Sequence, residues 1–536
     1  MEVFQTLIMK KLILFLLFIP LLGYSQICSP PSASASLDIG NVQATILNGG
    51  DFYFDGQTST YLVPKSDPST GSPGVRTMFG GGIWLSALTS SNNLKVTAMT
   101  YRNQGFEFYP GPIDNISGVS DFGTCNYFDQ IWEVLDIEVQ QHINLTNNST
   151  PVSINQINSH ILNWPGKGNS HLGTITIPDE LAPFVDLNNN NIYEPEYGDY
   201  PKIQGDQALF WVMNDIGGPN EVYGGQPLKV QVQMLAYAYQ SGLLVNTTIY
   251  ECKVFNKSFG NLHDFRFGLF LDPELPPSTS NYVGCDTIRQ SSFSYLGNIN
   301  STISPVNSVT FLNQEMNSFN FFINSGPLQF QDPSDAIEVN NFLHAKHANG
   351  TPFSDPGVIG FIPITYYFPG DPDDSNSWSM NNSIQTSPAD FRTLQTSGPH
   401  DLNAWTSFDI SWAVHTSFPD NYSPNDFYDG VSIEIDSVQD LFDNFNNTYD
   451  HSTITGVGSF NQLDDKTELF PNPSHDFIEL SYEEFNLKSI DLYSIDRKLI
   501  THDLARLIDI RDLNSGIYIL EIVFEEGTVI KKFVKN

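Results

Sequence analysis

Residues 186–199 contain the sharpest local pattern of side chains that could do chemistry. Oxygen-bearing side chains alternate along the start of this segment, at positions 186, 188 and 190. When a loop winds tightly, ligands at alternating positions converge on one point, and Ca²⁺ takes about six to eight such oxygens. The pattern therefore predicts a calcium-binding loop. Its expected ligands are Asp186, Asn188, Asn190, the Ile192 carbonyl, Glu194 and Asp199.

The same segment also suits a plain turn without an ion. Tyr197 stands where a calcium loop of this spacing carries its bidentate carboxylate, and neutral Asn ligands weaken affinity. Glu194, Glu196 or Asp199 could supply the missing charge. Asn and Asp side chains also hydrogen-bond to the backbone in ordinary turns. Calcium is thus the expectation and an ion-free loop of Asx turns is the alternative.

Motifs for catalysis do not accompany this loop. His344 and His347 lie three positions apart, a spacing that could place two metal ligands on one helical face, but no HExxH motif contains them. The GxSxG nucleophile elbow is missing as well. Aromatic rings could stack on sugars, although most such rings fill cores. The tryptophans considered for this role are Trp84, Trp132, Trp211 and Trp405.

The four cysteines bear on the cellular compartment. No CxxC pair exists, which argues against a zinc or thioredoxin-type site. In an exported protein an even number of cysteines permits two disulfides, in any of three connectivities, and buried free thiols are the alternative. The possible disulfide cysteines are Cys28, Cys125, Cys252 and Cys285.

The charge balance restricts the partners. The chain has 24 Lys and Arg against 60 Asp and Glu, a formal net charge of −36. A field of this sign repels the phosphates of nucleic acids and of anionic lipids. We therefore expect no nucleic-acid partner.

The composition favours β-structure. Aromatic residues make up 13% of the chain, and Gly, Pro, Asn and Asp interrupt the apolar segments often. Such a pattern is typical of short strands joined by turns. The glycine run at 80–82 lacks the ending of a phosphate loop and predicts instead a tight turn or a strand bulge. Residues 27–445 are expected to form a β-rich extracellular region with one or more β-sandwich-like domains, as one unit or two subdomains.

The first residues resemble an export signal. Lys10 and Lys11 precede an apolar run over 12–22, and small or polar residues follow it. This order is typical of a secretory signal peptide, here expected at 1–26. No other run of 18 apolar residues occurs, so the mature protein is expected to have no transmembrane helix.

The residue pattern of the sequence changes near the C-terminus, from a turn-rich segment to segments of alternating apolar residues. A turn-rich segment at 446–467 predicts a linker. Beyond it, alternating apolar residues predict strands over 477–482, 489–494, 498–504, 507–510, 516–524 and 529–534. Short strands at this density indicate a small Ig-like β-sandwich over residues 468–536.

This C-terminal segment resembles the type A sorting domain of the type IX secretion system of Bacteroidetes. The resemblance lies in FPNPSHDFIEL at 470–480, SIDLYSIDRKLI at 489–500, DIRDLNSGIYILEI at 509–522 and KKFVKN at 531–536. It implies export through the periplasm, recognition by the type IX machinery at the outer membrane, and release or attachment at the cell surface. The residues that match the sorting motif are Phe470, Pro471, Asn472, Pro473, Asp491, Gly516, Tyr518, Lys531, Lys532 and Lys535.

Blocks of the central region resemble a group of exported Bacteroidetes proteins without a known activity. The blocks include LNGGDFYFD at 47–55, GDQALFWVMND at 205–215 and FPGDPDD at 368–374. The resemblance implies secretion but no chemistry. The expected function is that of a calcium-stabilised adhesin or carbohydrate-binding protein with a glycan or protein ligand. A secreted hydrolase (glycosidase or peptidase) and a structural surface-layer component are the alternatives.

Overall fold

The computed structural model is mainly β, which confirms the predicted fold class. It describes residues 28–535 apart from 148–149, 174–180, 298–304, 324–329, 355–361, 384–386, 420–425, 449–466, 483–485, 495–498, 503–504, 512 and 525–527. The predicted signal peptide at 1–26 and most of the predicted linker lie outside the described residues. The chain divides into two compact units, Met1–Gln439 and Asp440–Asn536, and each is described by itself.

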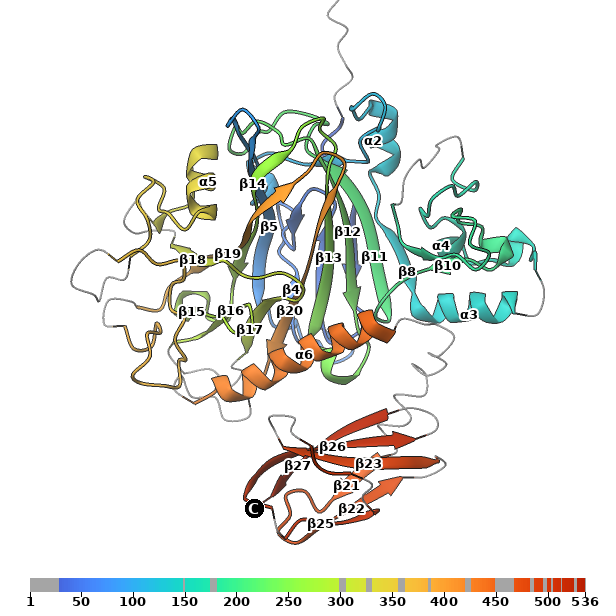
Figure 1. Cartoon of the computed structure of the whole chain (residues 1–536), viewed down its shortest axis with the longest axis vertical. Helices are drawn as coiled ribbons and strands as arrows, with labels where there is room; N and C mark the ends of the chain where they lie inside the picture. Colours follow the sequence, from blue (N-terminus) through green and yellow to red (C-terminus); the bar gives the residue numbers. More distant parts are fainter. Residues whose placement is uncertain are drawn as a thin grey trace, which may run out of the picture. The chain divides into compact units, whose positions relative to one another are not determined.

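The first unit contains two nine-stranded sheets (Figure 1). One sheet has the order β1-β2-β3-β5-β14-β19-β18, with β4 beside β2 and β6 beside β5. Every pairing in it is antiparallel. Its strands are β1 (Ser34–Leu37), β2 (Gln43–Leu47), β3 (Asp51–Phe52), β4 (Tyr61–Leu62), β5 (Met78–Thr89), β6 (Leu94–Ala98), β14 (Leu262–Pro273), β18 (Ser318–Ile323) and β19 (Phe391–Leu402).

The other sheet has the order β15-β16-β17-β20-β13-β12-β11-β7, with β8 beside β11. Strands from distant parts of the chain meet at the centre of this sheet, where β13 pairs with β20. The strands are β7 (Tyr109–Pro110), β8 (Trp132–Leu135), β11 (Gln207–Asn214), β12 (Val230–Ala238), β13 (Thr247–Asn256), β15 (Asn281–Asp286), β16 (Ser291–Leu296), β17 (Val306–Phe311) and β20 (Ser407–Ser417).

Aromatic side chains fill the space between the two sheets. Trp412 of β20 stacks on Tyr250 of β13, with 5.2 Å between ring centroids. Phe52 of β3 and Phe267 of β14 reach Trp412 from the opposite sheet, at 6.0 and 5.8 Å. All four rings are almost completely buried. Because burial of each large apolar side chain contributes about 2 kcal/mol, this inter-sheet cluster is a main source of stability.

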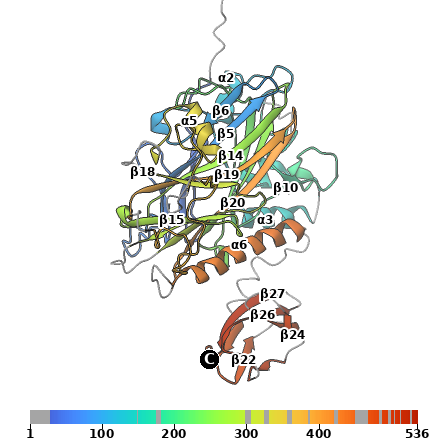
Figure 2. The same cartoon turned by 60° about the vertical axis from the view of Figure 1, so that its left-hand side comes forward.

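The helices lie outside the two sheets rather than between them (Figures 1 and 2). Val431 and Ile435 of α6 pack against Phe293 of β16 and Val306 of β17. The α-helices are α2 (Phe122–Phe128), α3 (Asp136–Thr146), α4 (Ser159–Leu162), α5 (Ala336–Leu343) and α6 (Tyr428–Thr448). The 3-10 turns are η1 (Arg102–Gln104), η2 (Ile154–Gln156), η3 (Pro195–Tyr197), η4 (Gly242–Leu244) and η5 (Ser278–Ser280). In the described part of the chain, none of the helices combines the length and apolar character needed to cross a bilayer.

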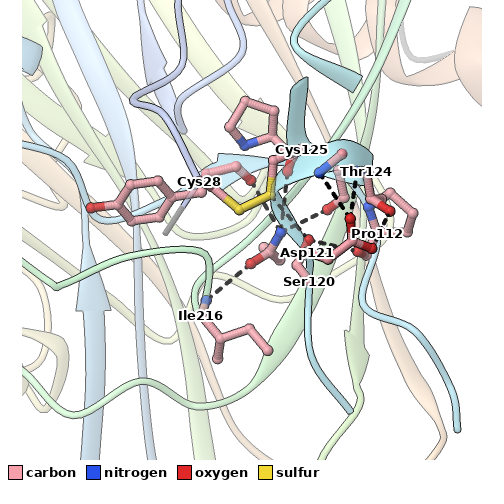
Figure 3. The surroundings of a disulfide bond; sticks show 12 residues. Cys28, Pro112, Ser120, Asp121, Thr124, Cys125 and Ile216 are labelled. Atoms are coloured by element: carbon pink, nitrogen blue, oxygen red, sulfur yellow. Dashed lines mark hydrogen bonds between the residues drawn. A yellow bond between two sulfur atoms is a disulfide. The ribbon is translucent and has the colours of Figure 1, made fainter. Parts of the chain in front are cut away.

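The cysteines adopt both of the states considered from the sequence. A disulfide joins Cys28 to Cys125 of α2, across 97 positions of the chain (Figure 3). The Cys28 backbone N–H also donates to the Gly217 carbonyl at 2.8 Å, which ties the first described residues to the loop after β11. Cys252 and Cys285 are free and buried. Burial raises the pKa of both thiols, so they behave as small apolar side chains.

The C-terminal unit has a three-stranded sheet, β21-β22-β25, and a four-stranded sheet, β24-β23-β26-β27. Its core contains Ile478, Leu480, Ile490, Leu520 and Phe533. The strands are β21 (Thr467–Phe470), β22 (Phe477–Tyr482), β23 (Leu487–Ser494), β24 (Leu499–Thr501), β25 (Leu507–Asp509), β26 (Gly516–Phe524) and β27 (Thr528–Lys535). Each strand predicted from alternation is present, and β21 precedes the Pro-Asn-Pro turn as an additional strand.

The glycine run forms part of β5, as a place of close backbone approach rather than a turn. A Cβ atom on Gly82 would lie 1.9 Å from the Met99 carbonyl oxygen. Gly82 is also paired with Asp51 of β3 and Phe270 of β14, so the strand has no room to shift. Only glycine fits where a second backbone passes this close.

We therefore expect Gly82→Ala to lower the free energy of unfolding by at least about 2 kcal/mol, because the added methyl group must push β5 away from the segment after β6. Urea denaturation of the purified protein measures this. The control is Gly430→Ala in α6, where no atom lies within 4 Å of the added carbon. That change should be neutral or stabilising, by up to about 1 kcal/mol. Equal effects of the two substitutions would contradict the packing described for β5.

Candidate functional site

The predicted calcium segment forms a tight loop between β9 (Phe184–Val185) and η3. Strand β9 pairs with β10 (Tyr200–Pro201), so the two ends of the loop are held together. Asn189 and Asn191 adopt left-handed backbone conformations, with φ values of 58° and 64°. Asn tolerates this region better than most residues, which explains how the run of Asn residues winds so closely.

Four of the predicted ligands gather in this loop. The Asp186 carboxylate accepts hydrogen bonds from the backbone N–H groups of Asn190, at 3.4 Å, and Asn191, at 2.6 Å. The side-chain amides of Asn188 and Asn190 both donate to one Glu194 oxygen, at 3.2 and 2.5 Å. Asp186, Asn188, Asn190 and Glu194 therefore share one small region on the outside of the loop.

Asp199 has a different position. Its side chain is buried, and its two oxygens accept hydrogen bonds from the backbone N–H groups of Leu187 and Glu194, both at 2.9 Å. Burial raises the pKa of this carboxyl above its ordinary value. Because the side chain is fully buried and both oxygens accept backbone hydrogen bonds, Asp199 closes the loop and is not accessible from its outer side.

The loop is anchored to the helices beside β8. Tyr193 is almost fully buried, and its hydroxyl donates to the Ile161 carbonyl of α4 at 2.7 Å. The Nε2 atom of His142, in α3, lies 3.1 Å from the Asp199 carbonyl oxygen. These contacts place the loop on a fixed base while its outer side stays exposed.

The oxygen groups of this loop fit a hard cation such as Ca²⁺ in type, since it takes carboxylate, amide and carbonyl oxygens. Among the described residues, no three His, Cys, Asp or Glu side chains group as a metal site. Any ion held here would therefore depend on Asn188 and Asn190 as well as on the two carboxylates.

The histidine pair from the sequence serves two separate purposes. His344 ends α5, and its ring contacts the Asn340 carbonyl and the Asp264 carboxylate at 2.7 and 2.8 Å. His347 is buried, with its Nε2 atom 3.4 Å from the Tyr367 hydroxyl. The two rings have different partners, so they do not act as two ligands of one metal site.

The four tryptophans divide clearly. Trp84 and Trp211 are fully buried, and Trp132 is 7% exposed, so these three belong to the interior. Trp405 is 42% exposed. It lies edge-on to Phe259, which is 77% exposed, with 5.6 Å between ring centroids. We call Trp405 and Phe259 the aromatic pair.

Backbone hydrogen bonds fix the aromatic pair in place. Trp405 lies in the turn between β19 and β20, in a left-handed conformation with φ of 63°. Its N–H donates to the Asn256 carbonyl at 2.9 Å. The Asn256 side chain donates to the carbonyls of Gly260 and Leu402, at 2.9 and 3.0 Å, and so joins the turn that carries Phe259 to the turn that carries Trp405. A bulky residue rarely adopts positive φ without such constraints.

A third loop lies beside the aromatic pair. Lys257 donates to the Asn115 side chain at 2.8 Å, and Gly118 lies against Phe259. The loop between them carries Ile116, which is 91% exposed, and Val119 is 52% exposed. Phe259 was not recognised as a site residue from the sequence. Its only signal was an aromatic residue within the polar turn NKSFGN at 256–261.

In the C-terminal unit, the entry turn of the sorting motif meets the last strand. The Val534 N–H donates to the Asn472 side chain at 2.9 Å, and the Ser474 N–H donates to the Val534 carbonyl at 2.9 Å. Phe470 is 45% exposed at the end of β21. Pro471 and Pro473, on either side of Asn472, are exposed as well. Segments about sixty positions apart thus form one continuous surface.

The remaining motif residues lie on the four-stranded sheet. Asp491 of β23 pairs with Glu521, and Gly516 at the start of β26 pairs with Lys535. Tyr518 stacks on Phe533, with 5.5 Å between ring centroids. Lys531 and Lys532 lie opposite Leu520 and Ile519 in the β26–β27 ladder. The motif is therefore distributed over the entry turn and three adjacent strands.

Two of the solved structures with weak similarity to the chain are enzymes, and no curated protein matches its sequence. One structure is a polysaccharide lyase, with 7% identity and a TM-score of 0.18, covering 66% of this chain and 38% of that one. The other is the family GH92 inverting mannosidase from Bacteroides thetaiotaomicron VPI-5482, with 6% identity and a TM-score of 0.20, covering 50% and 27%. This chain thus spans well under half of either structure, and TM-scores this low support no conclusion about function.

The family comparison concerns the C-terminal unit. The model described as the secretion system C-terminal sorting domain matches residues 468–536. This match agrees with the motif residues and with the seven-stranded unit that carries them. The chain therefore carries a type IX secretion C-terminal sorting domain, which interacts with the type IX machinery and directs the protein to the cell surface or the medium.

Proposed function

We propose that this exported protein binds saccharides, and that it does so at the aromatic pair. The observation that carries the proposal is that Trp405 and Phe259 are exposed while their backbone is fixed by Asn256. The face of an aromatic ring attracts the weakly positive C–H groups of a sugar ring through its quadrupole. Because the turns are already ordered, little conformational entropy is lost when a ligand binds.

The charge of the protein narrows the ligand class. A net charge of −36 repels acidic polysaccharides and anionic lipid surfaces. An apolar platform of Trp405, Phe259, Ile116 and Val119 does not depend on ligand charge. A neutral saccharide is therefore the ligand that this surface fits best.

We further propose that Ca²⁺ binds the 186–199 loop and stabilises the first unit. Asp186, Asn188, Asn190 and Glu194 would hold the ion together with the Ile192 carbonyl, while Asp199 keeps the loop closed. The closeness of the Asn188 and Asn190 side chains to the Glu194 carboxylate supports the proposal. The ion would neutralise two nearby carboxylates, and the charge relief is what stabilises the loop.

The calcium proposal predicts a higher melting temperature in Ca²⁺ than in chelator. When free Ca²⁺ is about 100 times Kd, an ion that binds only the folded state adds about 2.7 kcal/mol. The double variant Asp186→Ala/Asn188→Ala should lose this increment, because it removes two of the ligands. Differential scanning calorimetry measures the melting temperatures of the wild type and of the double variant, each with and without Ca²⁺.

Asp114→Ala is the matched control for calcium. Asp114 also holds an exposed loop by accepting hydrogen bonds from Ile116 and Ser117. Its loss should lower the melting temperature equally with and without calcium. If the melting temperature of the wild type is the same in Ca²⁺ and in chelator, calcium binding at this loop is ruled out. The segment is then an ion-free loop of Asx turns.

The saccharide proposal predicts binding without turnover. The purified protein is screened against neutral gluco-, manno- and xylo-oligosaccharides, and the best ligand is titrated by calorimetry. Trp405→Ala should weaken binding on the order of tenfold or more, about 1.4 kcal/mol, without lowering the melting temperature. Tyr197→Ala, at a ring that is 46% exposed on another loop, is the control and should bind as wild type does.

Equal affinity of wild type and Trp405→Ala would refute the role of the aromatic pair. Release of shorter sugars during the titration would favour the secreted hydrolase instead. Self-assembly of the protein without any saccharide binding would favour a structural surface-layer component.

A further inference from the structure

A groove of about 700 Å³ opens at one edge of the first unit, away from the residues used so far. Its walls come from four segments: the turn between β15 and β16, the loop between β17 and β18, the end of β19, and α6. Clefts of this volume are in the range that holds small-molecule ligands.

The inner part of the groove is apolar. Phe311 and Leu312 lie at the end of β17, and Ile435 projects from α6. All three side chains are buried. They form the floor of the groove, and Ile288, which is 86% exposed, adds apolar surface that a ligand can reach.

The charges along the groove leave it weakly negative. Arg289 donates to both oxygens of Asp436, at 2.9 Å each, and to Asp286 at 2.9 Å. Its guanidinium group is therefore already paired with carboxylates. Burial, and to a smaller extent the charge of Arg266, lowers the pKa of His400, so its ring is neutral at neutral pH. Glu315 is the exposed charge that remains on the lining, and it repels anions.

Side-chain amides on the rim are oriented by the backbone. The Asn313 oxygen accepts the Ser411 N–H, and the Asn317 oxygen accepts the Gly398 N–H, both at 2.7 Å. Each of these amides is therefore held with its NH₂ group directed away from that backbone contact. Gln314 is held the opposite way, since its NH₂ group donates to the Asp409 carbonyl at 2.8 Å. The rim thus offers fixed donors at Asn313 and Asn317 and an acceptor at Gln314.

We propose that this groove is a second ligand site, for a neutral oligosaccharide. Sugar hydroxyls both donate and accept hydrogen bonds, and the fixed amides offer both without a net charge. An anion would be repelled by Glu315 and would find the Arg289 guanidinium already paired with carboxylates. A purely apolar ligand would leave the amide groups without hydrogen-bond partners. The site shares its ligand class with the function proposed above but uses different residues, so either site can fail alone.

The test uses the full chain, with mannotriose and cellotriose as neutral probes and trigalacturonate as the acidic comparison. Binding is measured by calorimetry in wild type, in Trp405→Ala, and in Trp405→Ala combined with Asn313→Asp or Asn317→Asp. Each Asp keeps the oxygen that accepts the backbone N–H but loses the donor. We expect Trp405→Ala to retain binding of a neutral trisaccharide, and either Asp substitution to weaken it at least tenfold.

Asn349→Asp is the matched control, because Asn349 accepts the Thr351 N–H in the same manner on an exposed turn outside the groove. It should leave affinity unchanged. The groove site is overturned if Trp405→Ala abolishes all binding, if both Asp variants bind as their parent does, or if trigalacturonate binds more tightly. If Trp405→Ala binds with the same stoichiometry and affinity as wild type, and Asn317→Asp loses that binding, the groove is supported and the aromatic pair is overturned.

Discussion

The face-to-face burial of two antiparallel sheets is the constraint on which the first unit depends. Trp412 and Tyr250 from one sheet meet Phe52 and Phe267 from the other, and these strands come from widely separated parts of the chain. The loops that carry polar and aromatic side chains are attached to strand ends, so a rigid core keeps them in fixed positions. The close approach at Gly82 shows how little freedom the core leaves.

The position of a residue in the core or on a loop at a strand end distinguishes residues that pack the interior from chemically similar residues that are accessible to a ligand. Trp84 and Trp405 have the same side chain, but one is fully buried in β5 and the other is held outward on a turn. Asp199 and Asp186 belong to one loop and both accept backbone hydrogen bonds, yet Asp199 is fully buried and Asp186 is only half-buried. The C-terminal unit has its own core, and the contact of Asn472 with Val534 closes its motif into one surface. Secretion is thus a property of the C-terminal unit, whereas the ligand binding proposed above would belong to the first unit.

The sequence predicted some of this well, for physical reasons. Alternation in 518–524 gives the period of a half-buried strand, and β26 matches it. The central sheets could not be predicted, because the pairing of β13 with β20 joins residues more than 150 positions apart and leaves no local signal. For the same reason Phe259 was missed, since its neighbour Trp405 becomes visible only when two distant turns meet. The clustering of Asp186, Asn188, Asn190 and Glu194 followed from local spacing, although calcium itself stays a prediction.

Hydrogen–deuterium exchange of the chain in buffer containing Ca²⁺, with and without a saturating neutral oligosaccharide, tests the account most directly. The account predicts slower exchange in the turns at 256–261 and 403–406, with further protection at 312–317 when the groove is occupied. Exchange in the core strands β13 and β20 should not change, because they are already buried and rigid. Saturated binding that leaves all three loop segments unprotected would contradict the claim that loops on this sandwich hold the saccharide.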